Sequence, residues 1–101
     1  MNETALLKEL QKLPNVGPAV ARDLIKLGVK DSKDLAKMNP DEMYARLCRE
    51  TGTRQDPCVW DVFAALVDLA KGGPPQPWWR FTPIRKKQWG IRHPLDEISL
   101  R

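Results

Sequence analysis

Residues 13–21, "LPNVGPAVA", interrupt the chain between two segments whose apolar residues have helical spacing. Gly17 permits backbone angles that other residues avoid, and Pro18 suits the first turn of a helix because its missing N–H would have no partner there. Val16 is expected to anchor the loop in the core, and the small Ala21 lets the two helices approach each other closely. The stretch therefore predicts a tight turn between two packed helices.

The segments on either side of this turn each carry an apolar stripe. Within residues 3–13 the leucines recur at helical spacing, and the charged side chains between them are left for solvent. Residues 18–27 continue the pattern, and Gly28 is placed to end the helix because glycine readily adopts the left-handed conformation. We expect a helix over each range. The expected buried residues are Leu6, Leu7, Leu10, Leu13, Val20, Ala21, Leu24 and Ile25.

Three further helices are expected in the first two-thirds of the chain. A short one lies within 29–38, and Asn-Pro at 39–40 starts the next, which stops near Gly52. Asp-Pro at 56–57 repeats this capping pattern ahead of residues 58–71, which are apolar around most of a helix circumference. A helix of that kind is normally central to the core.

The character of the chain changes after Gly72-Gly73. Residues 72–101 contain most of the nine prolines and three of the four tryptophans, and they show no sustained helical stripe. Because proline fixes an extended backbone and interrupts helices, this part is expected to wrap around the body, extend or remain mobile. We therefore predict an all-α chain, with a five-helix domain at 1–71 and an extended C-terminal arm at 72–101.

The net charge of +4 is unevenly distributed. Residues 1–71 hold eleven basic and eleven acidic residues, whereas residues 72–101 hold six basic and two acidic ones, so the whole excess lies in the arm. A module that binds nucleic acid usually presents a basic face. The neutral body therefore weakens a nucleic-acid interpretation, and the arm partly restores it.

Composition also disfavours several classes of protein. No apolar run approaches the roughly 20 residues that span a bilayer, and the N-terminus has no export signal, so we expect a cytoplasmic location without a membrane partner. Cys48 and Cys58 form no CxxC pair, and His93 is distant in sequence, so a zinc site is not expected. Both cysteines are expected to be small core residues in a reducing compartment.

The start of the second helix is also a candidate anion site. The first N–H groups of a helix have no backbone partner, and with the partial positive charge of the N-terminus they attract phosphate oxygens. Asn15 opposes this role because its side chain would lie close to a bound phosphate. A phosphate-binding loop and a purely architectural turn therefore both stay open. The candidate phosphate-binding residues are Val16, Gly17, Ala19 and Val20 through backbone amides, and Lys12, Arg22 and Lys26 through charge.

The pattern L-x-x-L-x-N-V-G-x-x-x-A over residues 10–21 resembles the helix-hairpin-helix motif, in which two glycines flank an apolar residue in a tight loop. In this chain Asn15 replaces the first glycine, and Ala19 replaces a residue that is often basic in such motifs. Residues 29–48 look like a degenerate second copy, whose turn lacks glycine and carries Asp41 and Glu42. Two carboxylates there would repel phosphate, so we expect only the first hairpin to hold nucleic acid.

The order of "LPNVGPAVARDLIKLGV", "LAKMNPDEMYARLC" and "DPCVWDVFAALVDLA" before a tryptophan-rich end resembles the pathogenicity-locus family. These small bacterial helix-hairpin-helix proteins are also labelled mitomycin resistance proteins, and the likeness spans roughly residues 5 to 88. It implies a compact SAM-like or tandem helix-hairpin-helix bundle that is similar to DNA-binding modules and has no established activity. In helix-hairpin-helix proteins generally, hairpin carbonyls can hold a monovalent cation. In this chain the resemblance assigns that role to the backbone oxygens of Gln11, Leu13 and Val16.

The segment "PWWRFTPIRKKQW" interleaves aromatic rings with cations. Rings that stack on unpaired bases and cations that neutralise phosphates are the chemistry of single-strand binding. An alternative is that the rings cover an apolar groove of the small body, and we favour this role for Trp78, Trp79 and Phe81. The candidate nucleic-acid residues of the arm are Trp89, Arg85, Lys86 and Lys87.

The sequence contains no recognisable arrangement for catalysis, such as a nucleophile with a neighbouring base. Asp61 and Asp68 lie on one side of the central helix, which is expected to face solvent, and His93 has no evident orienting acid. We therefore expect a non-catalytic module, without cofactor or small-molecule substrate, that binds the DNA backbone without strong sequence preference. The alternative is an adaptor that binds a protein partner through the helical body and the arm.

Overall fold

The computed structural model describes residues 2–96 of the chain. All regular elements in this range are helices, so the expected all-α class is confirmed, and none of them is long and apolar enough to cross a bilayer. The α-helices are α1 (Glu3–Leu10), α2 (Pro18–Lys26), α3 (Ser32–Ala36), α4 (Pro40–Thr51), α5 (Cys58–Ala70) and α6 (Thr82–Ile91), and the 3-10 helices are η1 (Trp78–Phe81) and η2 (Pro94–Asp96).

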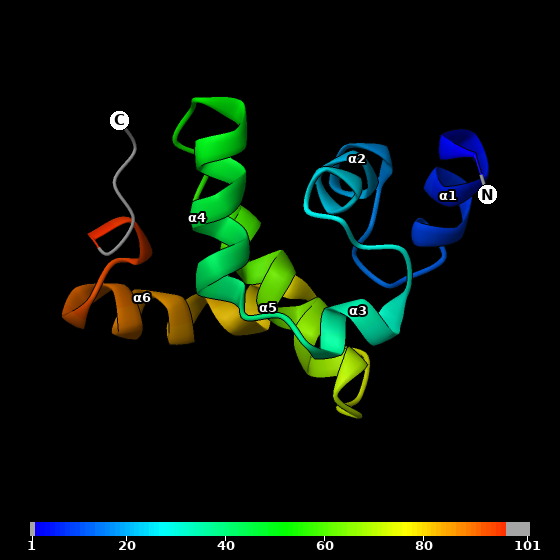
Figure 1. The fold of residues 1–101 in the computed structure, drawn as a ribbon. Coiled ribbons are helices and arrows are strands. Elements are labelled where there is room, and N and C mark those ends of the chain that lie inside the picture. The colour runs from blue at the N-terminus through cyan, green and yellow to red at the C-terminus, as the bar shows by residue number, and fades with distance from the viewer. Residues whose placement is uncertain (1, 97–101) are drawn as a thin grey trace.

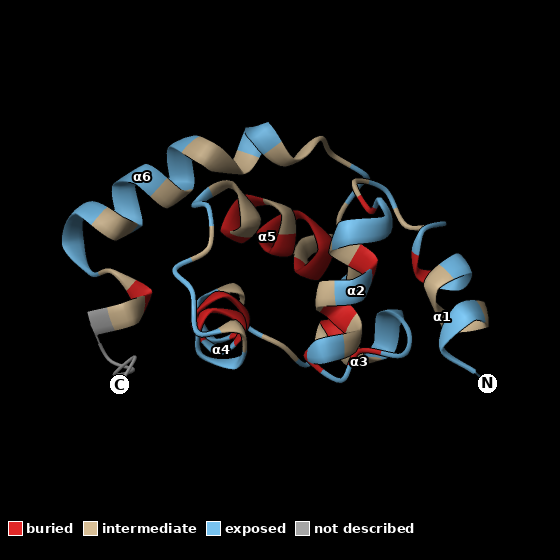
Figure 2. Ribbon diagram, turned by 90° about the horizontal axis from the view of Figure 1, so that it is seen from above, coloured by how far each residue is buried: buried red, intermediate tan, exposed pale blue. Residues whose placement is uncertain are grey.

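Helix α5 lies at the centre of the molecule, and the other elements are arranged around it (Figure 1). It buries residues on nearly all sides because its sequence is apolar around most of the circumference, as predicted. Helices α3 and α4 contact it from the body, and η1 and α6 contact it from the C-terminal part of the chain. Figure 2 shows α1 and α2 at one end of the molecule and α6 running along one side toward the opposite end.

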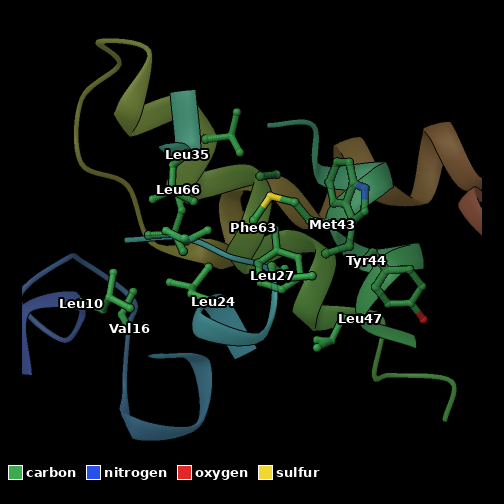
Figure 3. Packing of buried hydrophobic residues seen from close by; sticks show 14 of the residues in the cluster. Leu10, Val16, Leu24, Leu27, Leu35, Met43, Tyr44, Leu47, Phe63 and Leu66 are labelled. Atoms are coloured by element: carbon green, nitrogen blue, oxygen red, sulfur yellow. The ribbon is translucent and has the colours of Figure 1, made fainter. Parts of the chain in front are cut away.

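A single hydrophobic core gathers side chains from α1 through α5 (Figure 3). Leu10 and Val16 lie together at the end of the cluster nearest α1, and Tyr44 lies at the other end. Because Val16 is buried, the loop between α1 and α2 is anchored in the core, as the sequence indicates. The other labelled members of the cluster are Leu24, Leu27, Leu35, Met43, Leu47, Phe63 and Leu66.

Helix α1 is shorter than the sequence predicts. It ends at Leu10, and the Leu13 amide then donates to the Leu10 carbonyl at 3.1 Å in a turn. The physical reason is Pro14, because a residue that precedes proline is disfavoured in the helical conformation. The apolar spacing of Leu13 therefore continues the stripe beyond the end of the helix itself.

The other body helices begin and end close to the predicted residues. Asn39 caps α4 by accepting a hydrogen bond from the Asp41 amide at 2.7 Å, and Gly52 ends this helix with a φ of 66°. Cys48 is buried, as expected for a small core residue, whereas Cys58 at the start of α5 is only half-buried. The start and stop signals of the body are thus local and were readable from the sequence.

The prediction of an extended, non-helical arm over 72–101 is wrong for residues 78–91, which form η1 and α6. Pro83 lies in the first turn of α6, where a proline is tolerated because the N–H that it lacks would have no helical acceptor. The other prolines of this region precede or follow the helix. Among the described residues of this region, non-helical backbone lies in the connection between α5 and η1 and at Arg92, which follows α6 with an extended conformation.

The C-terminal helical segment packs on the body. Phe81, Trp89 and Leu95 all contact the core cluster. The Cα radius of gyration is 13.1 Å, which matches the roughly 13 Å expected for a compact domain of about 100 residues. This segment therefore completes the fold and covers one side of α5.

The prediction that Asp61 faces solvent is wrong. Asp61 is fully buried in α5, and its Oδ1 lies 2.8 Å from Nε of Arg85 in α6. The Thr82 hydroxyl donates to the other carboxylate oxygen at 2.6 Å. Because α6 covers this side of α5, the Asp61 carboxylate exchanges water for a cation and a hydroxyl donor.

Candidate nucleic-acid interface

The α1–α2 loop, residues 11–17, holds its shape through backbone bonds and one unusual residue. The Val16 amide donates to the Leu13 carbonyl at 3.3 Å. Asn15 has a φ of 69°, in the left-handed region that asparagine tolerates better than most side-chain-bearing residues. Asn15 therefore takes the backbone conformation for which a glycine would otherwise be used.

The start of α2 is exposed and has no side-chain cap. Gly17 occupies the N-cap position, and the first backbone bond of the helix joins the Ala21 amide to the Gly17 carbonyl at 3.0 Å. In the described part of the chain, the amides of Gly17, Ala19 and Val20 have no backbone acceptor. Gly17 and Ala19 are exposed, so these donors lie at the surface. Of the predicted amides, that of Val16 differs, because it is occupied within the loop.

The Asn15 side chain connects the loop to the C-terminal segment. Its Nδ2 donates to the Gln76 carbonyl at 2.8 Å, and its Oδ1 accepts from the Trp78 amide at 3.3 Å. The side chain that was expected to crowd a bound phosphate is thus turned toward the chain that enters η1. We call this pair of hydrogen bonds the Asn15 clasp.

The predicted basic rim of the loop is weaker than its residue count indicates. Lys12 pairs with Glu9 at 2.8 Å, so its charge is partly neutralised. Arg22 and Lys26 are exposed on α2, one helical turn apart. Burial raises the pKa of the Asp23 carboxyl between them, and the Lys26 and Arg22 charges oppose that rise. The usable positive charge on this helix therefore comes mainly from Arg22 and Lys26.

The structure separates the four candidate residues of the arm into two groups. The Arg85 side chain is only 12% exposed and is paired with Asp61, so it is not available to a phosphate. Lys86 and Lys87 are exposed on α6. Only these two lysines stay in a position from which a cation could reach a ligand.

Trp89 packs within the molecule. Its ring centroid lies 5.1 Å from that of Tyr44 and 4.2 Å from that of His93, and the Arg85 Cζ lies 5.3 Å from the Trp89 ring centroid. The indole Nε1 is buried and has no hydrogen-bond partner among the described residues. With its ring surrounded in this way, Trp89 serves the packing of α6 and is not available as a stacking platform for a base.

Sequence reasoning assigned Trp79 to the packing role, but this side chain is 60% exposed. It contacts Trp78 edge to face, with ring centroids 5.9 Å apart. The signal that could have identified its exposure is the spacing of Phe81, Arg85 and Trp89, which places these three residues on one helical face. Trp79 does not belong to that series.

The proposed cation site of the loop stays a prediction. The Leu13 carbonyl already accepts the Val16 amide, which leaves its second lone pair for a cation. Among the described residues, no group of three or more His, Cys, Asp or Glu side chains is placed to hold a metal ion. The predicted ligands of a cation at the α1–α2 loop are backbone oxygens and do not include such a group.

Comparisons with known proteins cover most of the chain. The family model Cdd1, described as "Pathogenicity locus", matches residues 3–87, which run from α1 into α6. The mitomycin resistance protein McrB of Streptomyces lavendulae is 40% identical over 79 residues, which are 78% of this chain and 75% of that protein. No solved structure matches the chain.

Proposed function

We propose that this chain, which belongs to the pathogenicity-locus family, is a non-catalytic helix-hairpin-helix module that binds the sugar–phosphate backbone of DNA without strong sequence preference. The observation that carries the proposal is the exposed, uncapped start of α2, where the amides of Gly17, Ala19 and Val20 lack backbone acceptors in the described part of the chain. Such a helix terminus attracts an oxyanion through its N–H donors and its partial positive charge.

Charged side chains on α2 complement these amides. Arg22 and Lys26 lie on the turns that follow the loop, and both are exposed. Each neutralised phosphate adds affinity by releasing counterions, so binding through two cations and a few amides is expected to be weak and sensitive to salt. The exposed Lys86 and Lys87 of α6 would supply two further cations for the phosphates of the bound DNA.

The absence of sequence preference follows from the kind of contacts proposed. Phosphate contacts position a protein on DNA, whereas base edges in the grooves carry the sequence information. The exposed side chains of α2 include Ala19, Arg22 and Lys26, which do not form a row of Asn, Gln and Arg able to read bases. The proposal also needs no catalytic step, and the Asp61 carboxylate is occupied by Arg85 and Thr82.

The test is a salt titration of DNA binding by the full chain and two charge-reversal variants. Arg22→Glu with Lys26→Glu is expected to weaken DNA binding strongly at low ionic strength, because both cations beside the amides become anions. The dependence of log K on log salt becomes shallower by roughly 0.9 for each phosphate contact that is lost, which makes about 1.8 for two. Arg49→Glu with Arg54→Glu, an equal charge change at two exposed arginines in the last turn of α4 and in the loop after it, serves as the control.

Failure of the wild-type chain to bind duplex, junction or single-stranded DNA at low salt would refute the proposal. Equal weakening by the two double variants would mean that only net charge matters and that the start of α2 is no specific site. Thermal unfolding of each variant separates a lost contact from a lost fold.

A second candidate function is a protein-interaction adaptor. The observation that favours it is the turn before α4, where Asp41 and Glu42 lie in the first helical turn and would repel phosphate. The neutral charge of residues 1–71 favours it as well. Under this alternative the Arg22→Glu and Lys26→Glu pair leaves DNA binding unchanged and disrupts capture of the protein partner.

A further inference from the structure

A groove beside η1 is the surface most suited to a flat ligand outside the α1–α2 loop. Trp79, which forms one of its walls, is the largest well-exposed apolar side chain among the described residues. A single exposed apolar residue needs no explanation by itself, but this one adjoins a concave surface. The residues that line the groove are Cys58 of α5, Trp78 and Trp79 of η1, and Thr82, Pro83 and Lys86 of α6.

The groove and the proposed phosphate site are linked through the start of η1. The Asn15 clasp holds the Trp78 amide 3.3 Å from the Asn15 side chain, and Gly17 follows Asn15 by two residues. The start of η1 is therefore fixed against the loop that carries the exposed amides. A strand whose phosphate lies at Gly17 would thus have Trp78, the first residue of η1, close by.

The charges in the lining of the groove suit a nucleic acid. Its lining contains the cation Lys86 and no carboxylate. Of the neighbouring acids, Asp61 is neutralised by Arg85, whereas the exposed Asp56 accepts a hydrogen bond from the Cys58 amide at 2.8 Å, which lowers the pKa of its carboxyl and keeps it charged. A polyanion would therefore meet the cation Lys86 in the groove and one negative charge, that of Asp56, beside Cys58.

We propose that this groove holds an unpaired base of DNA, stacked on Trp79, while the backbone of the same strand lies on the start of α2. The preferred substrate class is then a duplex that ends in a single-stranded extension. This inference rests on the proposed function, because the loop supplies the contact that brings the strand to the groove. Aromatic rings stack on unpaired bases of any sequence, so the preference concerns DNA structure and not base identity.

The arrangement of the two tryptophans supports this use of Trp79. The Trp78 ring meets the Trp79 ring at 84°, so Trp78 supports its neighbour from the edge and does not cover it face to face. Trp78 is half-buried and tied through its backbone to Asn15, which gives the exposed ring a firm base. Lys86 is then available for the phosphate that follows the stacked base.

The test compares the affinity of the full chain for a blunt duplex and for the same duplex with a short thymine extension. The wild-type chain is expected to bind the extended DNA roughly tenfold more tightly, which is within the range measured for stacking one base on an aromatic ring. Trp79→Ala is expected to remove this preference and leave the affinity for the blunt duplex unchanged. Ile91→Ala, at a side chain that is 83% exposed on the same helical segment, is the matched control.

Fluorescence provides a readout that a merely structural role of Trp79 would not change. The extended DNA is expected to quench tryptophan emission of the wild-type chain, because a stacked base quenches indole. Trp79→Phe keeps a ring, so it is expected to retain most of the tenfold preference while losing the quenching.

The outcomes separate this inference from the proposed function. No retention of either DNA overturns both. Binding of both DNAs with equal affinity, or a preference that survives Trp79→Ala, overturns only the assignment of the groove. If Trp79→Ala instead dissolves a dimer of this chain and leaves DNA binding unchanged, the groove is a self-association surface and the inference is wrong.

Discussion

Asn15 combines two properties that a single glycine could not supply. Its backbone adopts the left-handed conformation, and its side chain makes the two hydrogen bonds of the clasp. The sequence alone showed that Asn15 stands where the helix-hairpin-helix pattern has its first glycine. It could not show the reason, because the partners Gln76 and Trp78 lie more than sixty residues away.

Substitutions of Asn15 separate these two properties. Asn15→Gly keeps the backbone conformation and loses both bonds, and we expect a loss of about 1 kcal/mol of unfolding free energy, since each bond contributes about 1 kcal/mol and glycine relieves the strain. Asn15→Ala loses the bonds and retains the strain, so its unfolding free energy should be about 1 kcal/mol lower than that of Asn15→Gly. Urea unfolding is expected to show stability decreasing in the order wild type, Asn15→Gly, Asn15→Ala. Equal stability of Gly and Ala would contradict a strained loop.

Tyr44 provides a titration that reports on the core. It is the only tyrosine of the chain, it is buried, and its hydroxyl donates to the Gln55 carbonyl at 2.6 Å. Burial, with Cys48 as a second cause, raises the pKa of Tyr44 to about 12. The fold therefore stabilises the neutral phenol.

The pH dependence of stability follows from this raised pKa. The contribution of Tyr44 is fully present below its unfolded value of 10.0 and is lost as pH rises through the folded value of about 12. We expect the ultraviolet absorbance of the phenolate to appear near the upper value in the folded protein and near the lower one in urea. Ionisation at the unfolded value in the native protein would show that the ring is not enclosed.

At the scale of the element, the contact between α5 and α6 depends on a buried charge. Arg85→Met leaves the fully buried Asp61 without its cation, and we expect a loss of roughly 3 to 5 kcal/mol of unfolding free energy. Asp61→Leu together with Arg85→Met removes both charges and should recover much of that loss. Chemical denaturation measures both variants.

A neighbouring lysine provides the control for the α5–α6 pair. Lys86→Met removes an exposed cation of the same helix, so it should change stability little. If Lys86→Met destabilises the chain as strongly as Arg85→Met, the buried pair is not the origin of the effect.

The elements were predictable to the extent that their signals are local. The caps at Asn39 and the turn at Gly17 depend on neighbouring residues, and both appeared where the sequence placed them. Helix α6 was missed because the surrounding prolines masked a helix whose inward residues Arg85 and Trp89 continue the face begun by Phe81 of η1. The burial of Asp61 could not be read from α5, because its partner belongs to that unrecognised helix.

The candidate site was predictable in a similar way. The exposed amides of α2 follow from the loop sequence alone, whereas the state of each cation and ring depends on distant contacts. Lys12 is paired, Arg85 is buried, and Trp79 is exposed while Trp89 is enclosed. The types of residue were identified from the sequence, but their roles required the packing of the C-terminal segment.

At the scale of the whole molecule, the C-terminal segment is bound to the body at both ends of its path. The clasp holds its beginning at the α1–α2 loop, and the Asp61–Arg85 pair and the Trp89 ring hold α6 against α5 and α4. The predicted division into a domain at 1–71 and an arm at 72–101 therefore depends on whether residues 1–71 are stable without the C-terminal segment. A body that needs the segment to cover α5 would not fold independently.

Truncation tests this dependence. A chain that ends at residue 73 loses η1 and α6, so we expect a lower and broader thermal transition because one side of α5 becomes exposed. Circular dichroism follows the unfolding. A truncated chain that unfolds as sharply and at the same temperature as the full chain would establish residues 1–71 as an independent domain.

The cysteines of this chain offer a practical means of observing the groove. Cys48 is enclosed, and Cys58 lines the groove, so a thiol reagent has a single accessible target in the unmodified sequence. Burial raises the pKa of the Cys58 thiol, and the hydrogen bond that the thiol donates to the Asp56 carboxylate raises it further, which calls for mildly alkaline labelling. A dye attached there would report the arrival of a nucleotide at Trp79 directly, without an engineered cysteine and without altering either tryptophan.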